Sequence, residues 1–370
     1  MLILTLRQMA VNELATFLFN SREFEYLQEK YKSPIYLLPE EKWEHLIKEK
    51  LPPSSCPTAL RQEITAAIRP ISFEVGNWIL DHLKTEKGQS KIIKIPLLWK
   101  SDGTINRVKT ADMIIQSQNF SVELRFRMAC KYWCWHEIIK FLEGLSPNEN
   151  LIIYRKYAKY SLVTCKHIQY CLKFIANIRH SCQRFALEFP WTCVTMFNRV
   201  FDHLPLVNKI ELEIKAVKFG KIPLARHCLS RMDAQRRMRT LQLYPYHVLR
   251  IYLFWPLQAL FIDAAATVKE VLSNHSFLQL IHIIICQKIL PGWRDFDYRD
   301  LLRRFWQGIP ERCKEYVKGD GIFNILMVIL EGKGFRTSLR SGVPRRYLAH
   351  DRTLIENALK CSRLTFFSAN

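Results

Sequence analysis

Cysteine and histidine side chains between positions 130 and 171 have a spacing that could bind a zinc ion. Cys130 and Cys134 stand four positions apart, as do His167 and Cys171, so each pair would share one face of a helix. Two such helices packed side by side would present a Cys₃His ligand set. Cysteine is also a common small core residue, and the chain lacks the C-x₂-C spacing typical of structural zinc sites. The pattern therefore favours buried thiols, and we predict no metal site and no cofactor.

His136 and Glu137 begin a near match to the H-E-x-x-H motif of zinc metalloproteases. The second ligand position is Lys140, whose protonated amine does not bind zinc at neutral pH. The chain also lacks the phosphate-binding G-x-x-x-x-G-K-[ST] loop and the G-x-S-x-G nucleophile motif. A cysteine–histidine nucleophile stays open, because eleven residues of each type allow many pairings. With no recognisable catalytic set, we predict that the protein is not an enzyme.

An arginine cluster is the clearest candidate for a binding site. It comprises Arg226, Arg231, Arg236, Arg237 and Arg239, and the C-terminal tail adds Arg345 and Arg346. Arginine binds phosphate and carboxylate groups through two parallel hydrogen bonds, so these seven residues are the candidate polyanion-binding set. Tyr244 and Tyr246 follow the cluster and could stack on nucleic-acid bases. The alternative is a solvated helix face followed by a packed interhelical corner, with no ligand.

Positive charge is concentrated in three stretches of the chain. The 370 residues include 55 basic and 34 acidic side chains, a formal net charge of +21. The net charge is +6 over residues 151–190, +7 over 207–250 and +5 over 332–353, which together make +18 of that total. Residues 1–60 are nearly balanced. A concentrated basic field attracts polyanions. The expected partner is therefore an acidic protein surface or a nucleic acid.

Apolar residues recur at helical spacing along almost the whole chain, and glycine is scarce at 12 residues, which disfavours turn-rich β folds. We expect helices at 6–18, 39–51, 59–68, 71–83, 104–116, 121–134, 138–142, 152–179, 184–202, 209–219, 222–231, 233–242, 246–269, 275–289, 297–307, 309–317, 321–331 and 352–361. Pro70 is expected to end one helix, and Ser121 to cap another. Only 92–98 and 363–367 have the pattern of a strand.

Short connections between these helices predict an all-α protein of stacked antiparallel helical hairpins, either a degenerate α-solenoid-like array or a globular helical array. No ankyrin or tetratricopeptide repeat signature is present. We expect an N-terminal helical region over 1–100, a main helical-hairpin array over 101–331, and a basic, partly flexible tail over 332–370.

The chain has apolar and aromatic runs that resemble those of a known family, at 108–112, 126–130, 244–249, 282–288 and 292–298. In these runs it resembles a large family of all-helical arthropod proteins that is abundant in spiders, and the resemblance covers most of residues 1–331. The family has no established activity, so the resemblance implies a helical fold and adds no catalytic residue.

The N-terminal segment lacks a basic region and a cleavage site typical of a signal peptide, and no apolar run is long enough to span a membrane. The eleven cysteines show no disulfide framework. We therefore expect a cytoplasmic or nuclear protein of undetermined oligomeric state. Its expected function is that of a non-catalytic scaffold whose basic faces bind an acidic partner. The alternative is sequence-nonspecific binding of RNA or DNA through the 207–250 patch and the tail.

Overall fold

The computed structural model describes residues 5–82, 95–132, 134–144, 206–219 and 222–331, together with residues 146 and 148. In these ranges the chain forms sixteen α-helices and no β-strand, and packed antiparallel helix pairs recur, which confirms the all-α prediction. The helices are α1 (Leu6–Phe19), α2 (Arg22–Tyr31), α3 (Glu44–Lys50), α4 (Thr58–His82), α5 (Arg107–Gln116), α6 (Val122–Lys131), α7 (Trp135–Glu143), α12 (Leu206–Phe219), α13 (Ile222–Arg231), α14 (Ala234–Leu243), α15 (Pro245–Tyr252), α16 (Phe261–Val268), α17 (Asn274–His282), α18 (Tyr298–Gln307), α19 (Glu311–Lys318) and α20 (Ile322–Leu330).

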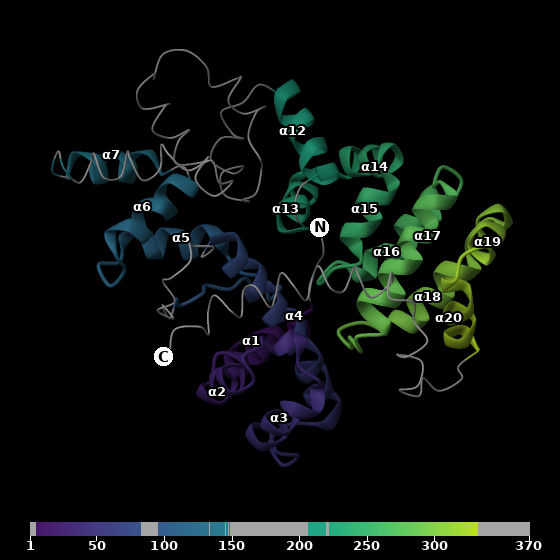
Figure 1. Cartoon of the computed structure of the whole chain (residues 1–370), viewed down its shortest axis with the longest axis horizontal. Coiled ribbons are helices and arrows are strands. Elements are labelled where there is room, and N and C mark those ends of the chain that lie inside the picture. The colour runs from purple at the N-terminus through teal and green to yellow at the C-terminus, as the bar shows by residue number, and fades with distance from the viewer. Residues whose placement is uncertain are drawn as a thin grey trace.

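The described helices form two groups along the chain, the N-terminal half (α1–α7) and the C-terminal half (α12–α20). In Figure 1, α1–α4 lie at the bottom of the view, α5–α7 at the left, and α12–α20 at the upper right. No described helix is both long and apolar enough to cross a membrane. The helices expected at 152–179, 184–202 and 352–361, and the strand expected at 363–367, lie outside the described residues.

Helix α1 begins at a capping box and packs along α4. The Thr5 hydroxyl accepts a hydrogen bond from the Gln8 backbone N–H at 3.1 Å, and the Gln8 side chain accepts one from the Thr5 N–H at 2.9 Å. Two backbone donors at the helix start are satisfied in this way. Ala15 is fully buried in the cluster that α1 forms with α2, α3 and α4.

The prediction that a helix ends at Pro70 is wrong, because α4 continues through this residue. Proline removes one intrahelical hydrogen bond and costs about 3 kcal/mol inside a helix. Ile68 before it and Ile71 after it are both fully buried, and Trp78 is 1% exposed. Burial of such side chains contributes about 1.5–3 kcal/mol each, so the tertiary packing outweighs the local cost.

Helices α5, α6 and α7 bury a second apolar cluster that includes Trp78 of α4. Ser121 caps α6 as predicted, accepting a hydrogen bond from the Leu124 N–H at 3.3 Å. The expected extension of this helix to residue 134 is wrong: α6 ends at Lys131, and Cys134 is the residue that precedes α7. Residues 95–98 of the expected strand form no strand, and only an isolated bridge pairs Trp99 with Ile105.

The C-terminal half encloses a third and larger apolar cluster. The single helix expected at 246–269 is wrong, because α15 ends at Tyr252 and α16 begins at Phe261. The intervening residues turn away and contain the cis peptide bond between Trp255 and Pro256. A π-helix, Ile283–Ile289, continues directly from α17.

Arginine side chains join the two halves of the chain. The Arg69 guanidinium on α4 donates hydrogen bonds to the carbonyl oxygens of Pro291 and Gly292 at 2.9 and 2.7 Å, and to that of Leu38 at 3.1 Å. Arg226 on α13 reaches Glu74 on α4, which lies 152 positions earlier in the sequence. These contacts fix the position of the surfaces that form the cleft described next.

Candidate binding cleft

A cleft of about 590 Å³ lies between the N-terminal and C-terminal halves. One wall is the segment 100–108 at the start of α5, and the other walls come from α13, α14 and the stretch 252–267 that includes α16. Leu229, Leu241, Leu257 and Leu260 contribute to an apolar lining. Its volume falls in the range of about 300–1,000 Å³ that is usual for small-molecule sites.

The wall before α5 is held by local hydrogen bonds and by one glycine. The Asp102 carboxylate accepts hydrogen bonds from the Thr104 N–H and hydroxyl at 2.9 and 2.6 Å. Gly103 has a φ of 73°, and a Cβ atom there would lie 2.2 Å from Cη2 of Trp255. Only glycine accommodates both this backbone conformation and this close approach. The wall is therefore packed directly against the C-terminal half.

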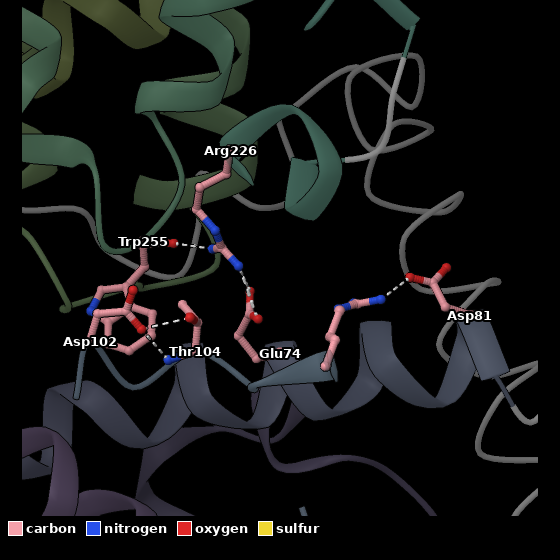
Figure 2. Close-up of polar contacts among 7 residues, drawn as sticks. Glu74, Asp81, Asp102, Thr104, Arg226 and Trp255 are labelled. Carbon is pink, nitrogen blue, oxygen red and sulfur yellow. Dashed lines mark hydrogen bonds and ion pairs between the residues drawn. The ribbon is translucent and has the colours of Figure 1, made fainter. Parts of the chain in front are cut away.

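Arg226, one of the seven candidate residues, lines the back of the cleft and is already engaged. Its guanidinium donates to the two carboxylate oxygens of Glu74 at 3.0 and 3.1 Å and to the Trp255 carbonyl at 2.8 Å. Figure 2 shows this side chain reaching from α13 to α4. The Arg226 and Glu74 side chains are only 14% and 7% exposed. Arg226 thus joins the two halves, with little hydrogen-bonding capacity left for a ligand.

A second buried ion pair lies beside the cleft. The Arg107 guanidinium contacts the Asp81 carboxylate at 2.7 Å, and both side chains are at most 4% exposed. Asp81 is close to the end of α4, as Figure 2 shows. Arg107 lines the cleft. Its charge is balanced by Asp81, so it adds little net attraction for an anion.

Among the buried and half-buried residues of the cleft, Arg237 and Tyr252 have polar side-chain groups that form no hydrogen bond or ion pair with the described residues. Arg237 is half-buried, and its guanidinium has no hydrogen-bond or ion-pair partner among the described residues. Tyr252 is 9% exposed, and its hydroxyl likewise has no hydrogen bond within the described parts of the chain. Burial raises the pKa of Tyr252, and the positive charge of Arg237 opposes that shift. Both side chains line the same cleft.

Of the other candidate arginines, the three that the structure describes, Arg231, Arg236 and Arg239, do not line the cleft. Arg236 forms an ion pair with Glu213 of α12, and burial raises the pKa of Glu213 even though Arg236 opposes the shift. Arg231 and Arg239 are exposed. Arg345 and Arg346 lie outside the described residues. The structure therefore brings Arg226 and Arg237 to one cavity and leaves Arg231 and Arg239 at the surface.

Sequence reasoning missed Tyr252 as a candidate, because it lies at the start of the apolar run 251–261 and has the pattern of a core residue. Tyr244, proposed for base stacking, is half-buried, and the Lys218 ammonium lies 4.8 Å from its ring centroid. This ring is thus already in contact with a cation.

The described residues contain no group of three or more side chains arranged to hold a metal ion. Cys130 and Cys134 are buried thiols, and they belong to different helical segments. His167 and Cys171 lie outside the described residues, so the four-residue set stays untested.

Comparison with known proteins gives no relative for this chain. No protein-family model matches it, and neither a curated protein nor a solved structure shows significant similarity. The family resemblance described above therefore stays a prediction.

Proposed function

We propose that this protein is a non-catalytic interaction protein that binds an acidic segment of a protein partner on the face of α13 and α14. The observation that carries the proposal is the charge of these two helices, which hold five arginines and no acidic residue. Arg226 and Arg236 are neutralised by Glu74 and Glu213, whereas Arg237 and Arg239 have no ion-pair partner in the described part of the chain. Partly exposed arginines of this kind suit carboxylate groups, which they bind in a bidentate manner.

The test is fluorescence anisotropy of the full chain with a labelled glutamate-rich peptide, at about 50 and about 200 mM salt, where electrostatic binding changes steeply. We expect binding of the peptide at the lower salt. The double variant Arg237→Ala/Arg239→Ala should weaken it about tenfold or more, because each charged hydrogen bond contributes about 1.5–3 kcal/mol. The matched control is Arg299→Ala, since Arg299 is an exposed arginine on α18, and it should leave binding unchanged.

A short RNA and a short DNA form the second arm of the experiment. Tighter binding of either nucleic acid than of the peptide, lost in the same double variant, would replace the proposal by the nucleic-acid alternative. The proposed face would be rejected if the peptide did not bind at the lower salt. It would also be rejected if the double variant and Arg299→Ala lost peptide affinity equally.

A further inference from the structure

The cleft beside this face has the size and lining of a small-molecule site. Its volume is about 590 Å³, and its walls come from both halves of the chain. Met238 and Leu260 line the cleft and are 42% and 37% exposed, so apolar surface continues to the solvent. An apolar body placed here would contact leucine side chains such as Leu229, Leu241 and Leu257. The lining therefore favours a ligand that is largely hydrophobic.

The charged residues of the cleft differ in what they can offer such a ligand. Arg226 is held by Glu74 and the Trp255 carbonyl, and Arg107 is held by Asp81. Asp102 accepts the two hydrogen bonds from Thr104. These groups complete the structure of the walls, and a ligand would have to displace buried contacts to reach them.

Arg237 and Tyr252 are different, since both side chains line the cleft with unused hydrogen-bond donors. The guanidinium of Arg237 has no partner among the described residues, and neither has the hydroxyl of Tyr252, although that side chain is nine-tenths buried. Neither group is a fully buried atom without a partner, so both reach the solvent and can exchange water for an acceptor on a ligand. A guanidinium and a phenolic hydroxyl lining one cleft provide three or more donors and one positive charge, which matches a carboxylate.

We propose that the cleft binds a small amphiphilic carboxylate, with its acid group on the Arg237 guanidinium and the Tyr252 hydroxyl and its apolar body along Leu229, Leu241 and Leu257. The remaining charged side chains of the cleft, Lys100 and Asp263, are exposed and of opposite sign. Asp102, hydrogen-bonded to Thr104, offsets the charge of Arg237 over the cleft as a whole, so the attraction for a carboxylate is local to the Arg237 guanidinium. This proposal shares Arg237 with the acidic protein partner, but it also requires the buried Tyr252 and does not require Arg239, so the variants at these two positions distinguish the two proposals.

The experiment compares octanoate with 1-octanol, which have the same chain length and differ in the charged group. Binding of each to the full chain is measured by calorimetric titration, with ligand-induced thermal stabilisation as a second readout. We expect octanoate to bind about tenfold or more tightly than 1-octanol, the usual advantage of a charge-assisted contact.

Two variants and one control locate the carboxylate. Arg237→Gln should bring octanoate to the affinity of 1-octanol, and Tyr252→Phe should weaken octanoate by about fivefold, because it removes one hydroxyl donor and keeps the ring. Arg239→Gln is the matched control, since it removes a charge from the same helix outside the cleft. Equal binding of the two ligands overturns the proposal. Absence of binding, or an octanoate affinity unchanged in both cleft variants, overturns it too.

Discussion

We expect the protein to become more stable toward alkaline pH because of Lys288, and replacing Lys288 with methionine should remove this rise. Lys288 is only 2% exposed. Its ammonium lies 4.1 Å from the ring centroid of Trp293, 4.6 Å from that of Phe254 and 5.4 Å from that of Tyr298. Burial lowers the pKa of Lys288 from 10.5 to about 8, and the charge of Asp295 opposes this shift. Methionine fills a similar volume and does not titrate.

The sign and size of the effect follow from this pKa. A lysine with a depressed native pKa loses its proton in the folded state at lower pH than in the unfolded state. Between pH 8 and 10.5 the unfolded chain therefore binds more protons, and the free energy of unfolding rises by up to about 1.4 kcal/mol per pH unit. Over the whole interval the gain is about 3 kcal/mol. Cation–π attraction to the three rings favours the charged form by up to about 2 kcal/mol and opposes the effect of burial, so the net gain lies between about 1 and 3 kcal/mol.

The assay is urea unfolding followed by circular dichroism at several pH values between about 7 and about 10.5, for wild type and Lys288→Met. We expect the difference in unfolding free energy, wild type minus variant, to rise by about 1 to 3 kcal/mol across this range. Taking the difference cancels the titration of other groups. Lys269→Met, which changes an exposed lysine, is the control and should give a flat difference. If the difference between wild type and Lys288→Met does not change with pH, the reasoning is refuted, and the rings hold the ammonium charged over the whole range.

Two further predictions concern the contacts between the halves, and urea unfolding checks both. Glu74→Ala should lower the free energy of unfolding by about 3 kcal/mol, because it leaves the buried Arg226 without a counter-charge. The control is Glu63→Ala, which breaks the exposed ion pair with Arg7 and should cost less than about 1 kcal/mol. Similar losses of unfolding free energy in the two variants would contradict the structural role of Arg226. Gly103→Ala should lower the free energy of unfolding by about 2 kcal/mol or more, and the control Gly292→Ala by only about 1 kcal/mol. Both glycines have a φ of 73°, but only at Gly103 would the added Cβ lie against Trp255.

Two prolines show where sequence reasoning about the fold succeeds and where it fails. Ser121 was predicted to cap a helix, and it caps α6. Pro70 was expected to end a helix and does not, whereas a helix was expected to continue through Pro256 and does not. Local propensity is similar for the two, and long-range packing decides the outcome. Ile71 beyond Pro70 is buried within α4, whereas the chain before Pro256 leaves the helix and places Trp255 against Gly103.

The candidate site shows the same division between local and long-range information. The arginine cluster is visible in the sequence as a run of like charges. The carboxylates that neutralise part of it are not, because Glu74 lies 152 positions from Arg226 and Glu213 lies 23 positions from Arg236. The role assigned to Tyr252 depends on its position in the cleft, and the sequence pattern around it indicates only a core residue.

Buried carboxylates determine which arginines of this face are available to a partner. Glu74 and Glu213 are 5% and 2% exposed, and a buried carboxylate is costly unless a cation accompanies it. Arg226 and Arg236 meet that requirement and become part of the structure. Arg237 stands next to Arg236 in the sequence but lines the cleft, and it forms no ion pair with any carboxylate in the described part of the chain. The net charge of the stretch therefore overstates its capacity to bind anions, and that capacity is concentrated where an arginine lacks a buried acidic neighbour.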